Sequence, residues 1–281
     1  DLSRDEVCEA VIKMITDVLK SAPISYVKWD MNRNMTEIGS TAWPAKKQKE
    51  IAHRYMLGLY KILENITSNF PNILFESCSG GGGRFDGGML YYMPQTWTSD
   101  DTDAIERLMI QEGTSLVYPT SSMGSHVSAV PNHQVHRITP LNTRGVVAMA
   151  GSFGYELDVT KMNEEEKEEV KKQVEFYKNI RSTVQFGDLY RLKSSFDSNE
   201  AAWMNLSKDG KEVVVSYVKK YAEANVIPRR LKVKALDENS LYEVIETGEV
   251  FGGDELMYIG LEIGELMGDY QAKNWTLRKV D

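Results

Sequence analysis

Apolar positions in the first two thirds of the chain alternate between helical and strand spacing. Between residues 4 and 20 they recur every three or four positions, which predicts a helix, and Ser3 with Glu6 has the spacing of an N-terminal capping box. The apolar run at 24–29 is typical of a strand and ends abruptly at Asp30. The same alternation predicts helices at 44–68, 102–111, 141–149 and 163–184, and strands at 73–76, 90–97, 127–130 and 154–157.

Polar residues follow the carboxyl ends of these strands. Strands that alternate with helices in this way are typical of a parallel α/β sheet, and a functional site is then expected at the carboxyl edge. We interpret residues 1–187 as part of a (β/α)8 TIM barrel, although an open doubly wound sheet would give a similar pattern. Five strands alone do not close a barrel.

The pattern changes at about residue 188, where apolar residues begin to alternate with polar ones. Strands are predicted at 201–207, 212–217, 230–235 and 241–246, with an Asp209-Gly210 turn between the first two. This alternation predicts a small antiparallel β-sandwich domain over residues 188–281.

Composition narrows the range of partners. The 281 residues carry a net charge of −8 without a cluster of Lys and Arg, so a nucleic-acid partner is not expected. No stretch approaches the ~20 apolar residues of a membrane span. Cys8 and Cys78 do not suggest a disulfide framework, and a reducing, cytoplasmic location is the default expectation.

Asp30 is the first candidate for chemistry. It stands two positions after Lys28 at a strand end, so both side chains should point to the same side. A neighbouring cation lowers the pKa of a carboxyl group and keeps it ionised, as a nucleophile requires. An ordinary surface ion pair is the alternative, and it is the commoner meaning of such a pair taken alone.

The second candidate is the acidic cluster at residues 97–103, at a strand-to-helix junction. Asp100 could act there as a general acid, while Asp101 or Thr102 could cap the next helix and Asp103 could lie in its first turn. A Mg²⁺ site for phosphoryl transfer is a further alternative, but no phosphate-binding loop accompanies the cluster.

Two other segments have both a functional and a structural interpretation. The glycine-rich segment 76–84 could let backbone amides approach a ligand or could be a flexible turn, and it lacks the ending of a phosphate-binding P-loop. His126, His133 and His136 match no familiar zinc spacing, so we interpret them as hydrogen-bonded loop residues and assign no metal.

Two acids on separate strand ends of one barrel face meet the needs of glycoside hydrolysis. One attacks the anomeric carbon and the other protonates the departing oxygen, and no cofactor is required. Aromatic residues near these strand ends could stack on sugar faces or could be buried between strands and helices: Trp29, Tyr91, Tyr92 and Trp97.

Three ordered motifs carry a resemblance to a known family. The segments KWDMNR at 28–33, SCSGGG at 77–82 and WTSDDTD at 97–103 closely resemble microbial α-galactosidases of glycoside hydrolase family 36. The resemblance continues through SHVS at 125–128, PNHQ at 131–134 and GDYQ at 268–271, so it covers essentially the whole chain.

The resemblance implies roles for individual residues. Asp30 would be the nucleophile of a retaining double displacement, and Asp100 would act first as acid and then as base, with Asp101 as the second choice. Lys28 and Asn32 would hold galactose hydroxyls. The residues lining the pocket near the 2-hydroxyl would be Cys78 and Gly80. The substrates implied are terminal α-galactosides such as raffinose and melibiose.

One departure from the family pattern qualifies these expectations. Family members have an N-terminal β-domain and three βα units ahead of the helix with which this sequence opens, so the chain is expected to hold barrel strands four to eight and the terminal β-domain. Part of the sugar pocket would then be absent. The alternatives are a non-catalytic sugar-binding or packing module, galactosyl transfer, or α-N-acetylgalactosaminidase activity, and we expect self-association or pairing with the absent half.

Overall fold

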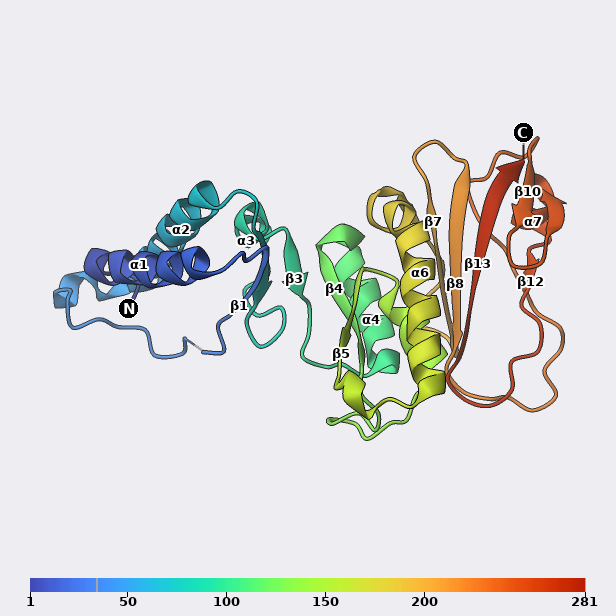
Figure 1. Cartoon of the computed structure of the whole chain (residues 1–281), viewed down its shortest axis with the longest axis horizontal. Helices are drawn as coiled ribbons and strands as arrows, with labels where there is room; N and C mark the ends of the chain where they lie inside the picture. Colours follow the sequence, from blue (N-terminus) through green and yellow to red (C-terminus); the bar gives the residue numbers. More distant parts are fainter. Residues whose placement is uncertain (34, 281) are drawn as a thin grey trace. The chain divides into compact units, whose positions relative to one another are not determined.

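The computed structural model describes residues 1–33 and 35–280, which form two compact units, 1–97 and 98–281 (Figure 1). In the first unit, β1 pairs with β2 and β2 pairs with β3, both in parallel. Its elements are α1 (Asp5–Ser21), β1 (Tyr26–Asp30), η1 (Ala45–Glu50), α2 (Ile51–Asn69), β2 (Leu74–Cys78), α3 (Gly87–Tyr92) and β3 (Gln95–Trp97).

The core of the first unit lies between the helices and one face of this small sheet. The apolar face of α2 supplies Ile62, Leu63 and Ile66, which are fully buried against Phe75 of β2 and Met89 of α3. Helices α1 and α2 pack side by side. The helical spacing seen in the sequence is therefore the spacing of buried positions.

Two sequence predictions in this unit are wrong. The N-cap of α1 is Arg4 without a side-chain cap, because the Ser3 hydroxyl instead donates to the Asp1 carboxylate at 2.6 Å. Residues 90–92, predicted as strand, belong to α3, because the Asp86 carboxylate accepts from the Met89 amide at 2.8 Å and starts a helical turn there. Only Gln95–Trp97 remains as strand β3.

The second unit continues the strand and helix alternation before the β-domain begins. Strands β4 and β5 are parallel. The predicted capping box of α6 is confirmed, since Asn163 and Glu166 bond each other's backbone amides. The elements are α4 (Ala104–Ser115), η2 (Thr120–Ser122), β4 (Met123–Ser128), α5 (Leu141–Ala148), β5 (Ser152–Glu156), η3 (Val159–Lys161) and α6 (Glu164–Phe186).

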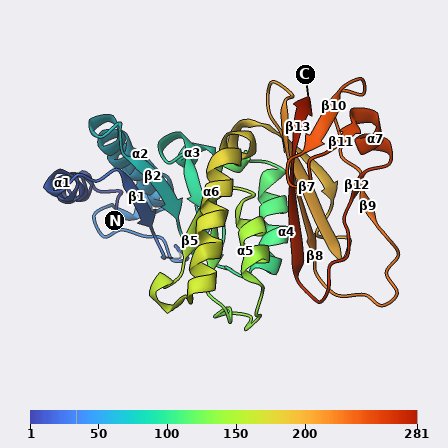
Figure 2. The ribbon, with the colours of Figure 1, turned by 45° about the vertical axis from the view of Figure 1, so that its right-hand side comes forward.

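An antiparallel six-stranded sheet, ordered β11-β10-β13-β8-β7-β6, dominates the rest of this unit. Helices α4, α5 and α6 form a layer between β5 and this sheet (Figure 2). The strands are β6 (Asp188–Lys193), β7 (Glu200–Leu206), β8 (Glu212–Lys219), β10 (Leu241–Val244), β11 (Glu249–Gly252) and β13 (Gln271–Val280).

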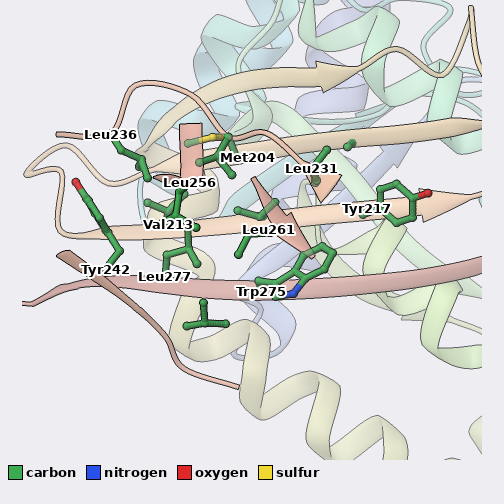
Figure 3. Packing of buried hydrophobic residues seen from close by; sticks show 14 of the residues in the cluster. Met204, Val213, Tyr217, Leu231, Leu236, Tyr242, Leu256, Leu261, Trp275 and Leu277 are labelled. Atoms are coloured by element: carbon green, nitrogen blue, oxygen red, sulfur yellow. The ribbon is translucent and has the colours of Figure 1, made fainter. Parts of the chain in front are cut away.

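A two-stranded ribbon, β9 (Arg230–Leu231) with β12 (Leu261–Glu262), and α7 (Gly253–Tyr258) cover the other face of this sheet. Figure 3 shows Leu231 and Leu261 of the ribbon beside Trp275 and Tyr217 of the sheet, all almost fully buried. None of the helices in the described residues is long and apolar enough to cross a membrane.

Candidate active site

The three parallel strands of the first unit have two chemically different faces. Val27, Trp29 and Phe75 lie on the face that packs against the helices. Because side chains alternate along a strand, the opposite face carries a row formed by Lys28, Glu76 and Gln95, which are neighbours in the strand register. Asp30 and Cys78, themselves register partners, form the next row at the carboxyl ends. The polar residues therefore gather on the face that the helices leave uncovered.

Asp30 is exposed and surrounded by hydrogen-bond donors. Its carboxylate accepts from the Asn32 side-chain amide at 2.9 Å and from the Met31 backbone amide at 2.9 Å. Slight burial raises the pKa of Asp30, but the donors Asn32, the Cys78 thiol and Met31, helped by the charge of Lys28, outweigh it and hold the pKa below its ordinary value. The group is therefore ionised near neutral pH.

The Cys78 thiol lies beside Asp30, its register partner, and donates a hydrogen bond to the Asp30 carboxylate. Burial, helped by the hydrogen bond to Asp30 and its negative charge, raises the pKa of Cys78 to about 11. A buried thiol with such a pKa is a poor nucleophile at neutral pH and remains a hydrogen-bond donor. Both cysteines of the chain are free and buried.

The glycine-rich loop after β2 is joined to the end of β1 by hydrogen bonds. The Gly80 amide donates to the Asn32 side-chain oxygen at 2.7 Å, and the Ser79 hydroxyl donates to the Met31 carbonyl at 2.6 Å. Gly80 has φ +53°, a left-handed conformation that suits glycine. Asn32 thus bridges Asp30 and Gly80, and four of the residues singled out from the sequence, Asp30, Asn32, Cys78 and Gly80, are brought together.

Lys28 lies near Glu76 and Trp97, two residues that the sequence did not link to it. Its ammonium nitrogen lies 3.9 Å from Glu76 Oε1 and 4.9 Å from the centre of the Trp97 ring. Glu76 is fully buried. The sequence-based prediction placed Glu76 at the polar end of a strand. A charged residue inside the apolar run ILFESC nevertheless indicates a buried charge, and a buried charge requires partners.

The three aspartates of the acidic cluster at residues 97–103 differ in their hydrogen bonding. Asp103 is the N-cap of α4, accepts from the amides of Ile105 and Glu106, and pairs with Arg137. The Asp101 carboxylate accepts from the Asp103 amide at 3.1 Å. The prediction that Asp101 or Thr102 caps the helix is therefore wrong, because Asp103 takes that position.

Asp100 differs from its two neighbours in this cluster. It is exposed, and within residues 1–33 and 35–280 no hydrogen bond or ion pair of its carboxylate is found. The backbone beside it is fixed, because the buried Arg107 guanidinium donates to the Ser99 carbonyl at 3.2 Å and to the Gly124 carbonyl at 2.8 Å. The Asp100 carboxylate is therefore exposed and without a structural partner in the described residues, beside a backbone that Arg107 holds in place.

The aromatic residues and histidines considered from the sequence lie in different parts of the fold. Trp29 and Tyr92 pack against the helical core, Trp97 is buried, and Tyr91 is exposed. His126 lies in β4 rather than in a loop, with Nδ1 3.6 Å from the Glu156 carboxylate. In the described part of the chain, no group of three or more His, Cys, Asp or Glu is arranged to hold a metal ion.

Comparison with known proteins identifies the architecture and then the family. The fold is a partial (β/α)8 barrel followed by an antiparallel β-domain, as in the solved structures that it matches. The melibiase family model matches residues 1–187, and the model of the glycosyl hydrolase family 36 C-terminal domain matches residues 200–277. The chain therefore belongs to the melibiase family, within glycoside hydrolase family 36.

Individual relatives agree with this assignment. The chain is 61% identical over 280 residues to the α-galactosidase AgaA of Geobacillus stearothermophilus and 51% identical over 281 residues to the α-galactosidase Mel36A of Lactobacillus acidophilus. Each match covers 100% of this chain but only 38% of the relative's length. A crystal structure of an AgaA variant with raffinose matches it with TM-score 0.97 and 60% identity, covering 100% of this chain and 39% of that one.

Proposed function

We propose that this chain carries the catalytic carboxylates of a retaining α-galactosidase. The observation that carries the proposal is Asp30, an exposed carboxylate at a strand end, kept ionised by three hydrogen-bond donors and a nearby cation. An ionised, accessible carboxylate of this kind is what attack on an anomeric carbon requires. The proposed substrates are terminal α-galactosides of the raffinose and melibiose type.

The proposed reaction has two displacements. Asp30 attacks the anomeric carbon while protonated Asp100 gives its proton to the departing glycosidic oxygen, which leaves a covalent galactosyl ester on Asp30. Asp100 then removes a proton from water, whose oxygen attacks the anomeric carbon and releases Asp30. Two inversions leave galactose with the configuration of the substrate. Asp100 suits both proton transfers because its carboxylate has no structural bond in the described residues.

The remaining site residues are proposed to bind the sugar. Lys28 and Asn32 would hold galactose hydroxyls, and Cys78 with Gly80 would line the pocket near the 2-hydroxyl. The side chains of Asn32 and Cys78 both contact Asp30, so groups that bind the sugar would also fix the nucleophile. We also propose that the catalytic barrel region ends near residue 187 and that the β-domain begins at 188.

Two solved structures of AgaA variants support the choice of aspartates. One AgaA variant with a replaced aspartate is in complex with raffinose, and another with a different replaced aspartate is in complex with stachyose. The interval between the two replaced positions equals the interval between Asp30 and Asp100. Replacement of a catalytic carboxylate is a usual way to keep a substrate intact in a complex, so this agreement favours the pair.

The test is hydrolysis of p-nitrophenyl α-galactoside by the chain and by a chimaera in which it replaces the matching segment of AgaA. We expect an active chimaera that loses activity in Asp30→Ala and keeps it in Asp17→Ala, since Asp17 is an exposed residue on α1 paired with Lys13. If the chain is inactive and the chimaera is active, the activity requires the segments that AgaA supplies. An inactive but folded chimaera, or an active Asp30→Ala variant, would contradict the proposal.

A further inference from the structure

Glu76 is the most deeply buried charged residue on the polar face of the first unit. It lies in the middle strand, β2, between Lys28 of β1 and Gln95 of β3 in the register, and its solvent exposure is 0%. The next row toward the carboxyl ends holds Asp30 and Cys78. Glu76 is therefore one row below the proposed nucleophile and does not reach it directly.

The two oxygens of Glu76 have different surroundings. Oε2 accepts from the Tyr26 hydroxyl and from the Gln95 side-chain amide, the latter at 2.7 Å. Oε1 has no hydrogen-bond donor in the described residues and lies 3.9 Å from the Lys28 ammonium. Tyr26 and Gln95 thus fix the carboxylate, and its second oxygen is left to attract Lys28.

Lys28 is consequently held from two sides. The carboxylate of Glu76 attracts its ammonium group from one side, and the ring of Trp97 lies 4.9 Å from it on another. Lysine has a long, flexible side chain and would otherwise move toward the nearest negative charge. That alternative charge is Asp30, which lies two residues later on the same strand face and already feels the charge of Lys28.

We propose that Glu76 is a positioning residue, which holds Lys28 where it binds a galactose hydroxyl and keeps it from closing a direct ion pair with Asp30. The inference rests on the proposed function of Asp30 and Lys28. Without the carboxylate, Lys28 swings toward Asp30, so the sugar loses a hydrogen-bond donor and the nucleophile becomes masked. Galactoside binding weakens, and attack on the anomeric carbon slows.

The experiment is a double-mutant cycle in the AgaA chimaera, with p-nitrophenyl α-galactoside as substrate. Glu76→Gln keeps the size of the side chain and removes its charge, and it is expected to raise KM and lower kcat/KM by roughly tenfold or more. In a Lys28→Met background the same substitution is expected to cause less than about a twofold further loss, because Glu76 acts through Lys28. Equal losses in both backgrounds would overturn the proposal.

Glu200 in the β-domain supplies the matched control. It is also a buried carboxylate that accepts from a tyrosine, Tyr217, and pairs with cations, here Lys193 and Arg229. Glu200→Gln should lower the unfolding midpoint while KM and kcat per folded molecule stay unchanged. If Glu76→Gln behaves like Glu200→Gln, Glu76 has only a structural role and the proposal fails.

The outcomes separate this inference from the proposed function. An active chimaera that is abolished by Asp30→Ala, but has an unchanged KM in Glu76→Gln, overturns the role of Glu76 alone. A chimaera that remains active in Asp30→Ala overturns the proposed function itself.

Discussion

Asp30 and Asp100 are both exposed aspartates, but their hydrogen bonding differs. Asp30 accepts hydrogen bonds from Asn32 and Met31, and these donors, with the Cys78 thiol, keep its pKa low. The carboxylate of Asp100 has no such partner in the described residues. A carboxylate that is held ionised by donors suits a nucleophile, and an exposed carboxylate without a structural partner suits a group that transfers protons. The proposed assignment of roles follows from this difference.

Asp100→Asn should affect substrates according to their leaving group. Raffinose hydrolysis, which needs a proton on the departing oxygen, should fall by roughly 10²-fold to 10⁴-fold, whereas formation of the galactosyl intermediate from p-nitrophenyl α-galactoside should fall far less. Asp101→Asn is the control, because an amide oxygen can still accept from the Asp103 amide. Single-turnover kinetics on both substrates would measure this, and equal losses on both would contradict the role.

Asn32→Ala should move the acid limb of the pH profile. The Asn32 amide stabilises ionised Asp30, so its removal raises the pKa of Asp30, and the ionised nucleophile is then lost at a higher pH as the solution is acidified. The acid limb of kcat/KM should therefore shift to higher pH. Asn69→Ala, which removes an exposed hydrogen bond on α2, should leave the limb in place. If the acid limb of kcat/KM does not shift in Asn32→Ala, the hydrogen bond from Asn32 does not lower the pKa of Asp30.

Part of the candidate site could be predicted from the sequence. Asp30, Asn32, Cys78 and Gly80 lie together as the motifs suggested, because consecutive parallel strands end at one edge. Glu76 was not recognised, because the predicted strand ended at this residue, whereas β2 continues through it to Cys78 and buries it. The capping role of Asp103 was also assigned to its neighbours, since cap identity depends on a one-residue choice of helix start.

At the scale of elements, Gly58 lets the segment that leads into α1 pack closely against α2. A side-chain carbon added at Gly58 of α2 would lie 1.9 Å from the Leu2 carbonyl oxygen. Gly58→Ala should therefore destabilise the chain by about 1–3 kcal/mol, despite the better helix propensity of alanine. Gly113→Ala in α4, where the nearest atom is 3.9 Å away, should stabilise it by about 0.5–1 kcal/mol. Urea unfolding midpoints would test both, and shifts of the same sign would refute the packing argument.

Element prediction succeeded where the hydrophobic pattern was regular and failed where polar residues interrupted it. Helix α6 was predicted with its cap because Asn163, Glu166 and a long run of helical spacing agree. Strand β13, the ten-residue partner of both β8 and β10, was not predicted. Its polar and charged residues interrupt the alternation, and it becomes a strand because two neighbours offer it hydrogen bonds.

At the scale of the whole molecule, an open strand edge has consequences. Strand β1 is the outer strand of its sheet and pairs with β2 along Tyr26–Asp30. An unpaired strand edge tends to associate with another chain. We expect sedimentation of the isolated chain to show species larger than a monomer, and a single monomeric species of native-like stability would contradict this.

The most direct measurement is covalent trapping of the nucleophile in the AgaA chimaera. A fluorinated galactosyl fluoride reacts without needing an acid and leaves an ester that breaks down slowly, so peptide mass spectrometry can locate the sugar. We predict one fluorinated galactosyl group on the peptide that contains Asp30, and none in Asp30→Ala. A label on another carboxylate, or an active chimaera that releases inverted galactose without any label, would contradict this prediction.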